Sequence, residues 1–346
     1  MMKNRQIRAF LFTFSLISFL GNSSLFADTR SSTLFNLMSY QEVLEMSLEF
    51  DLDALIGNRR NEGSEKGLLT FKDANGKKQE WLTKVSLRGK FRRMRCEEMP
   101  PLKLKFKKDH LLANDLLPFN DMKLVTPCVS DKQTAKELIV KEYLAYKLYN
   151  ELSNASYRVQ LVRITYKDSK SRKKSKHWGF IIEDTAELRS RLNADKCESC
   201  FGLPIEQFSQ DQLKVIQIFQ YMIGNADWNV KIGRNIKRVI TGKQQYQAIP
   251  YDFDSSGLVD APYALPNPDY GLTYIGERYE GYLEGILPTD EVFQLFRDKQ
   301  DRFLQIVRDS KQLHYEAKKK TIAYINSFYE QINQDSKPQD GELMGD

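Results

Sequence analysis

The fold is decided by the stretch KELIVKEYLAYKLYNEL, residues 136–152, which carries the strongest helix pattern in the first half of the 346-residue chain. The apolar side chains that recur on one side of it at helical spacing are Leu138, Tyr143, Ala145, Tyr146, Tyr149 and Leu152. Strand patterns precede and follow this stretch. The first half of the chain therefore predicts strands grouped around one long helix.

The strand patterns are short and alternate between apolar and polar residues. Asn75-Gly76 lies between Gly67–Phe71 and Trp81–Leu87 and predicts a hairpin turn. In Leu102–Phe106 the two lysines share one face and the apolar residues share the other. Leu48–Leu55 is expected to form an edge strand that runs into a short helix.

Beyond residue 184 the pattern becomes helical over residues 210–224, 291–307 and 312–332, around a strand expected at Tyr246–Asp254. The sequence thus predicts an α+β fold of two lobes. A strand-rich N-terminal lobe with one main helix covers residues 46–184, and a mostly helical C-terminal lobe covers residues 185–332. Residues 28–45 are expected to form a loose lead-in, and residues 333–346 a disordered tail.

Residues 1–27 have the pattern of a secretory signal peptide. Three basic residues precede an apolar run over residues 9–21, and Ala27 supplies a small residue at a cleavage site. The run is shorter than the ~20 residues that a bilayer span needs, although an N-terminal membrane anchor is the alternative. We expect an exported protein, periplasmic or extracellular, with no transmembrane segment after cleavage.

The four cysteines allow two disulfides in an exported chain. We favour the pairs Cys96–Cys128 and Cys197–Cys200. With three histidines in the whole sequence, a structural zinc site is not expected. Lys and Arg (52) only modestly outnumber Asp and Glu (46), and loss of the signal peptide lowers the formal charge from +6 to +3, so no nucleic-acid partner is predicted.

The densest group of residues suited to chemistry lies between positions 223 and 257. Asp227 follows a predicted helix end, Asn235 comes eight residues later, and Asp252 and Asp254 follow an apolar strand. Residues two apart on extended backbone face the same side, and two carboxylates with a side-chain amide suit Mg²⁺ or Mn²⁺. An upstream Asp can deprotonate a hydroxyl. Asp and Asn in loops also cap helices and build turns, so a purely structural interpretation stays open.

In this order, these motifs resemble the kinase-like family of spore-coat protein H (CotH), over residues 45–310. The other motifs that carry the likeness are Arg88-Gly89-Lys90, Pro101–Phe106 and Glu142–Lys147. The resemblance implies a two-lobed protein-kinase-like fold. It also implies ATP and Mg²⁺ or Mn²⁺ as cofactors, and transfer of the γ-phosphate to a hydroxyl of an unknown exported protein.

The resemblance assigns the chemistry of the second half as follows. Asp227 accepts the proton of the acceptor hydroxyl, and Asn235 binds the metal. Asp252 is a further metal ligand, with Asp254 as a second candidate beside it.

In the first half, the resemblance assigns nucleotide phosphates to Lys103 or Lys105, with Glu142 on the long helix as the ion-pair partner of that lysine. Arg88 and Lys90, on either side of a glycine, cover the phosphates. A solvated strand face is the alternative for the two lysines.

The sequence also departs from an ordinary kinase pattern. It contains no GxGxxG, the Asp227–Asn235 spacing is eight with Asn229 as a nearer rival, and Asp254 stands where DFG has Gly. These departures leave two other functions open. One is a pseudokinase that binds a nucleotide or another ligand without turnover, and the other is a glycosyltransferase that uses Asp252-Phe-Asp254 as a DxD motif.

Overall fold

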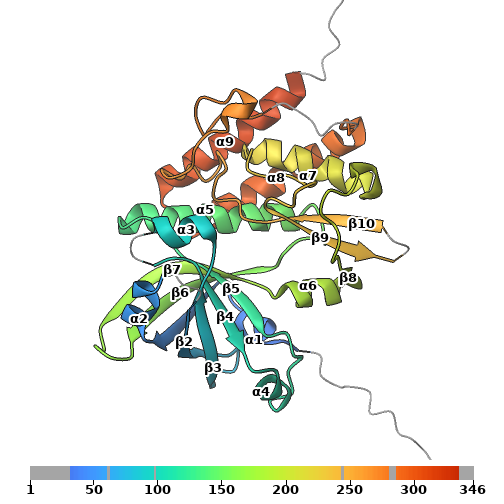
Figure 1. Ribbon diagram of the computed structural model, residues 1–346. Coiled ribbons are helices and arrows are strands. Elements are labelled where there is room, and N and C mark those ends of the chain that lie inside the picture. Colours follow the sequence, from blue (N-terminus) through green and yellow to red (C-terminus); the bar gives the residue numbers. More distant parts are fainter. Residues whose placement is uncertain (1–31, 61–62, 97–98, 243–244, 280–285, 335–346) are drawn as a thin grey trace, which may run out of the picture.

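The computed structural model describes residues 32–60, 63–96, 99–242, 245–279 and 286–334 (Figure 1). In this part of the chain, a closed β-barrel packs on one side of a long helix and a group of helices packs on the other, with a small sheet beside them. The barrel strands are β1 (Val43–Phe50), β2 (Ser64–Lys72), β3 (Lys78–Leu87), β4 (Leu102–Phe106), β5 (Asp121–Val125), β6 (Val159–Asp168) and β7 (Lys174–Ile182). Their order around the barrel is β1-β2-β3-β4-β5-β7-β6.

The barrel forms because its strands alternate between inward apolar and outward polar side chains. Strand β4 is a clear case, with three buried apolar residues separated by Lys103 and Lys105 on the outside. The predicted hairpin is confirmed as β2 and β3, and Gly76 in its turn has φ +76°. Each strand contributes to the barrel interior, for example through Leu44, Leu69, Val85, Leu104, Leu124, Ile164 and Ile181.

The expected kinase-like fold of two lobes is wrong, because the strands close into a seven-stranded mixed barrel. The closing strand is β1, which was expected at the edge of a sheet. It pairs antiparallel with β2 and also parallel with β6, with Leu44 opposite Val162. The alternation of side chains reports which face of a strand is buried but not which distant strand lies beside it. The sequence pattern therefore predicted the strand and missed its second partner.

The long helix α5 (Lys132–Asn150) confirms the predicted helix and lies between the barrel and helices α7 (Gln210–Ile223), α8 (Asp290–Asp309) and α9 (Tyr315–Gln334) (Figure 1). Its Tyr146 packs against Phe180 of β7, with ring centroids 5.5 Å apart, and against Phe253 on the other side, at 4.7 Å. These contacts place the residues that follow β10 directly against α5. The helix thus fixes the position of the candidate site relative to the barrel.

A second sheet and several helices complete the described residues. The sheet has the order β10-β9-β8, where only one strand was expected in this region, and consists of β8 (Ala194–Lys196), β9 (Ile236–Thr241) and β10 (Gln245–Pro250). The helices besides α5 are α1 (Leu34–Met38), α2 (Leu52–Gly57), α3 (Lys90–Arg95), α4 (Lys108–Leu112), α6 (Thr185–Arg191), α7 (Gln210–Ile223), α8 (Asp290–Asp309) and α9 (Tyr315–Gln334), with 3₁₀ turns at Ile205–Gln207 and Pro268–Tyr270. Helix α1 lies within the segment that was expected to be a loose lead-in.

Both predicted disulfides are present, Cys96–Cys128 and Cys197–Cys200. The first joins the end of α3 to the loop that precedes α5, and the second closes a short loop after β8. In the described ranges, no helix has both the length and the apolar character needed to cross a membrane. The predicted signal peptide and residues 335–346 of the predicted tail lie outside the described residues.

Candidate functional site

Two loops that are hydrogen-bonded to each other carry the candidate residues of the second half. One follows α7 and the other follows β10. The N–H groups of Gly257 and Leu258 donate to the carbonyl oxygens of Gly224 and Ile223, each at 3.0 Å. Gly224 ends α7 with φ +62°, and a Cβ at this position would clash with the Tyr324 hydroxyl. A glycine is therefore required where the two loops meet.

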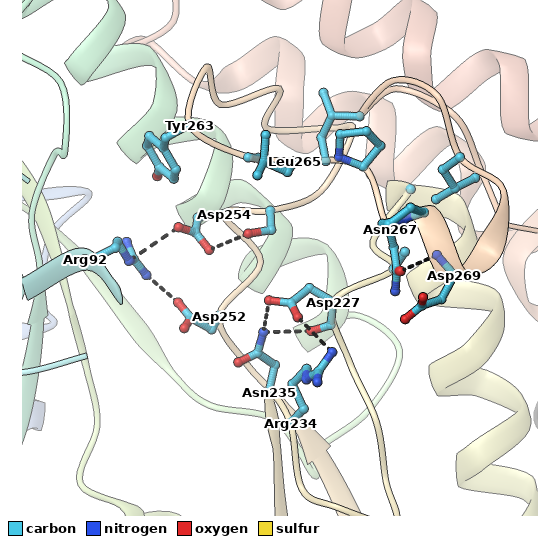
Figure 2. A pocket seen from close by; sticks show the side chains of 18 of the residues that line it. Arg92, Asp227, Arg234, Asn235, Asp252, Asp254, Tyr263, Leu265, Asn267 and Asp269 are labelled. Atoms are coloured by element: carbon cyan, nitrogen blue, oxygen red, sulfur yellow. Dashed lines mark hydrogen bonds and ion pairs between the residues drawn. The ribbon is translucent and has the colours of Figure 1, made fainter. Parts of the chain in front are cut away.

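Asp227 and Asn235 are brought together despite their eight-residue spacing (Figure 2). The Asn235 Nδ2 donates to the Asp227 carboxylate Oδ2 at 3.0 Å and to the Asp227 carbonyl oxygen at 2.7 Å. The rival Asn229 accepts from the Ile232 N–H and pairs through its backbone with Arg234, so it shapes the intervening turn. Both side-chain hydrogen bonds that Asn235 makes within the described residues use its nitrogen, so its side-chain oxygen has no hydrogen bond among them.

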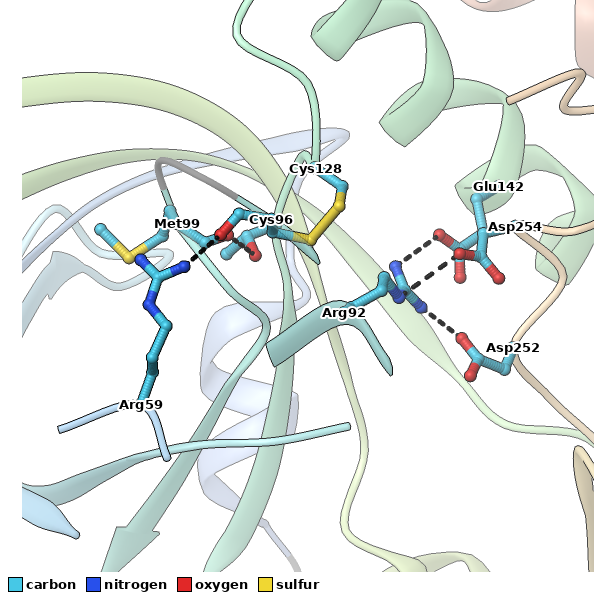
Figure 3. Close-up of a disulfide and its surroundings, with 9 residues drawn as sticks. Arg59, Arg92, Cys96, Met99, Cys128, Glu142, Asp252 and Asp254 are labelled. Atoms are coloured by element: carbon cyan, nitrogen blue, oxygen red, sulfur yellow. Dashed lines mark hydrogen bonds and ion pairs between the residues drawn. A yellow bond between two sulfur atoms is a disulfide. The ribbon is translucent and has the colours of Figure 1, made fainter. Parts of the chain in front are cut away.

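Asp252 and Asp254 meet on one guanidinium, that of Arg92 in α3 (Figure 3). Asp252 forms an ion pair with Arg92 Nη2, and Asp254 Oδ2 lies 3.3 Å from Arg92 Nε. The extended backbone that was expected here is absent at Asp252, which has φ +64°. Its N–H donates to the Tyr146 hydroxyl at 2.8 Å, so α5 holds this turn in place. The two carboxylates converge through a turn, and not through strand alternation.

Glu142 of α5 is the third carboxylate at this guanidinium. Its Oε2 lies 3.7 Å from Arg92 Nη1, while its buried Oε1 makes no hydrogen bond within the described structure. One guanidinium therefore faces three acidic side chains in a buried position, more than it could neutralise if all three were ionised. Burial first, and then Asp254 and Asp252 among the nearby charges, hold the pKa of Glu142 well above its usual range, although Arg92 opposes this.

Lys103 and Lys105 do not contact Glu142 among the ion pairs of the described residues. Both point outward from β4, and the Lys103 ammonium lies 2.6 Å from Asp121. Lys90 is the first residue of α3, two residues before Arg92. The expected ion pair between a lysine and Glu142 is thus taken over by Arg92, which the sequence did not distinguish from its neighbouring arginines.

Lys123 of β5 is a further site residue that sequence analysis missed. It is the direct cross-strand neighbour of Lys103, and its ammonium lies 4.8 Å and 5.3 Å from the ring centroids of Tyr157 and Tyr251. Burial first, and then the nearby charges of Arg88 and Lys237, lower the pKa of Lys123 to about 8. A lysine in a short strand is an ordinary surface pattern, so nothing in the sequence marked it.

Arg88 and Lys237 lie close enough to Lys123 to act on it electrostatically, and these three cations are called the cation cluster below. No ion pair joins any of the three to a carboxylate within the described residues, although Asp252 lies close enough to act on Lys123. Burial raises the pKa of Asp252, but Arg92, Arg88 and Lys123 together outweigh it and lower the value. The cluster is therefore a group of positive charges beside a carboxylate that stays ionised.

Asp227 faces a cavity of about 540 Å³. Asp227, Asp252 and Asp254 line the cavity together with Asn235, and Tyr263 and Leu265 form part of its outer wall (Figure 2). The Asp227 side chain is 46% exposed, which leaves it accessible to a molecule in the cavity. Burial raises the pKa of Asp227, helped by Asp252 and opposed by Arg234 and Asn235.

The donor set fits a divalent cation that keeps part of its water shell. In the described ranges, no three His, Cys, Asp or Glu side chains are grouped closely enough to hold a metal by themselves. Mg²⁺ commonly binds through one or two carboxylates together with water and substrate phosphates. Asp252, Asp254 and the side-chain oxygen of Asn235 are ligands of this kind, with the Arg92 guanidinium as the present partner of both carboxylates.

No protein-family model matches this sequence, and a search of curated proteins finds no significant relative. The resemblance to the spore-coat protein H family remains a prediction that rests on the motifs of the sequence.

Proposed function

We propose that the protein is a phosphotransferase that moves the γ-phosphate of ATP to a protein hydroxyl with the help of Mg²⁺ or Mn²⁺. The observation that carries the proposal is the surroundings of Asp252. The charges of Arg88 and Lys123 act on this ionised carboxylate, and it lines an open cavity together with Asp227 and Asn235. Phosphate transfer needs these three kinds of group next to one another.

The cation cluster suits the phosphates of the nucleotide. Three positive charges without a carboxylate ion pair among the described residues attract a polyanion. Bound phosphates would also offset the repulsion that Arg88 and Lys237 exert on the Lys123 ammonium. A bound triphosphate would raise the pKa of Lys123 again by supplying the missing negative charge. In this proposal Lys123 and Arg88 replace Lys103 and Lys105 as the phosphate contacts.

Asp227 suits the acceptor end of the reaction. The hydroxyl oxygen of the acceptor attacks the γ-phosphorus, the bond from that phosphorus to the β–γ bridging oxygen breaks, and ADP leaves. The hydroxyl proton passes to the Asp227 carboxylate, which Asn235 holds in place through its amide. A divalent cation, when bound, would neutralise charge on the phosphates and would be held by Asp252, Asp254 and Asn235.

A second candidate function, ligand binding without turnover, is supported by the contacts of Arg92. Its guanidinium occupies both Asp252 and Asp254, the side chains that a catalytic cation would need. A protein that keeps this arrangement would bind a nucleotide on the cation cluster and leave it intact. No observation favours the DxD glycosyltransferase, and β1–β6 is the single parallel pair between named strands of the described sheets.

We also propose that the protein is exported. The two disulfides support this, since such bonds persist in oxidising compartments and are rare in the cytoplasm of most organisms.

The test of function is transfer of label from γ-labelled ATP, in the presence of Mg²⁺ or Mn²⁺, to an acceptor-protein mixture or to the protein itself. We expect transfer by the wild type, and a loss of at least ~100-fold in Asp227→Asn and Asp252→Asn, because each removes a carboxylate that acts on the reacting groups. Asp211→Asn is the matched control, since this aspartate is exposed on α7 and 95% of its side chain is accessible. Equal transfer by wild type and both site variants would refute the assignment, and nucleotide binding without any transfer would favour the second candidate.

A further inference from the structure

We infer that Arg92 is a tethered cation that competes with the divalent metal for Asp252 and Asp254, and that the Cys96–Cys128 disulfide holds it in the competing position. The inference rests on the metal site of the proposed function and adds a control on that site. It concerns α3, the six-residue helix that carries Arg92.

The contacts of Arg92 are those of a substitute for a metal ion. The residue is buried, and its three guanidinium nitrogens are divided among three carboxylates, those of Glu142, Asp252 and Asp254. A divalent cation beside the same two aspartates would bring two positive charges to within a few ångströms of the guanidinium. Like charges at that distance repel strongly in a buried site, so the metal and Arg92 exclude each other from these carboxylates.

Local interactions within helix α3 do little to fix its position. It is six residues long, and Gly89 at its N-cap has φ +75° and provides no side-chain cap. A helix of this length is unstable alone in water, so its position depends on contacts with the rest of the protein. Its first residues follow this glycine, which permits backbone rotation, and its last turn ends at Cys96.

The Cys96–Cys128 disulfide is one of the contacts that hold α3 in position. Cys96 is the C-cap of α3, and Cys128 lies three residues before Asp131, the N-cap of α5. Glu142, the ion-pair partner of Arg92, lies on the same helix α5. Figure 3 shows the covalent link and the ion pairs side by side, as two connections between α3 and the α5 region. Arg59 adds a hydrogen bond from its Nη1 to the Cys96 carbonyl oxygen, at 3.1 Å.

If the disulfide holds Arg92 on the aspartates, then loss of either the cation or the tether frees the carboxylates. Removal of the guanidinium frees them completely. Removal of the disulfide keeps Arg92 in the chain but allows α3 to move away from the aspartates, so the gain in metal affinity is smaller. The second disulfide, Cys197–Cys200, joins a loop after β8 and has no connection to α3. The inference therefore predicts an order of metal affinities.

The experiment measures Mn²⁺ binding to the full chain without nucleotide, through the electron paramagnetic resonance signal of free Mn²⁺. We expect Arg92→Gln to bind Mn²⁺ at least tenfold more tightly than the wild type. The double variant Cys96→Ser/Cys128→Ser is expected to lie between these two, and Cys197→Ser/Cys200→Ser to match the wild type. Arg92→Lys is the second variant, should Arg92→Gln fail to fold, because lysine keeps the charge but lacks the forked nitrogens of the guanidinium. We expect Arg92→Lys to bind Mn²⁺ more tightly than the wild type and less tightly than Arg92→Gln.

Binding of Mn²⁺ to Arg92→Gln or Arg92→Lys that is no tighter than binding to the wild type would overturn the inference. Equal Mn²⁺ affinities in the two cysteine double variants would also overturn it, because the Cys96–Cys128 disulfide would then not hold Arg92 on the aspartates. These outcomes are separate from the proposed function. Label transfer by a wild type whose affinity Arg92→Gln does not improve would leave the function and remove the inference. If Arg92→Gln binds Mn²⁺ more tightly than the wild type but neither protein transfers label, the inference would stand and the proposed function would be wrong.

Discussion

Lys123 allows the electrostatics of the site to be measured without any ligand. Its pKa is lowered from 10.5 to about 8, because the ammonium is buried and two cations lie nearby. Between these two pH values, the unfolded chain binds a proton that the folded chain has lost. The free energy of unfolding therefore rises with pH over this interval.

The size of the effect follows from the shift. One pKa unit corresponds to about 1.36 kcal/mol, so the interval from pH 7 to pH 10 should yield about 2 kcal/mol from this lysine. Other groups titrate in the same range, and the comparison with Lys123→Met removes their contribution. We expect the difference in unfolding free energy, wild type minus Lys123→Met, to increase by about 2 kcal/mol from pH 7 to pH 10.

Urea denaturation at half-unit steps of pH measures this difference. Lys103→Met is the matched control, because it removes a lysine from the adjacent strand whose ammonium is paired with Asp121. We expect its profile to follow the wild type. In Arg88→Gln and Lys237→Gln the increase should become smaller, since each variant removes one of the repelling charges. A wild-type profile parallel to that of Lys123→Met from pH 7 to pH 10 would refute the cation cluster.

Three other changes test the parts that hold the site. Gly224→Ala should cost about 2 kcal/mol or more of unfolding free energy in urea, because of the positive φ and the clash with Tyr324, and Tyr324→Phe in the same chain should restore part of it; an unchanged stability would contradict the packing of the two loops. Loss of Cys96–Cys128 should lower the unfolding free energy by about 3–4 kcal/mol, and loss of Cys197–Cys200 by roughly half as much, since the bridges span 32 and 3 residues; calorimetry that finds equal losses would count against this reasoning. Asn235→Ala removes a hydrogen bond that lowers the pKa of Asp227, so the acid limb of the transfer rate should move to higher pH, and an unmoved limb in the pH–rate profile would speak against the contact.

The local parts of the fold were predictable because their signals are local. The period of apolar residues placed α5 to within a few residues, and Asn75-Gly76 identified the hairpin turn. Both of these features depend on residues near one another in the sequence. The two favoured cysteine pairs are present, although the sequence held no signal that excluded the other pairings.

The closure of the barrel was not predictable in this way. Strand β1 pairs with β6, which lies more than a hundred residues later in the chain. The alternation of buried and exposed side chains in β1 is that of any strand with one buried face. The same limit applies to the site. Asp227 and Asn235 lie within one loop and were identified together, whereas Arg92 and Lys123 reach Asp252 only through the folded chain. Basic residues in a loop or a strand carry no signal of their own.

The central claim is that nucleotide phosphates and a divalent cation meet at Asp252, between the cation cluster and Asp227. Crystals of the protein grown with Mn²⁺ and a non-hydrolysable ATP analogue test it most directly, through the anomalous scattering of manganese. We expect a manganese peak bonded to Asp252, with Arg92 withdrawn from that carboxylate and the phosphates against Lys123 and Arg88. Manganese bound away from Asp252, or a nucleotide outside this site, would show that the proposed arrangement is wrong.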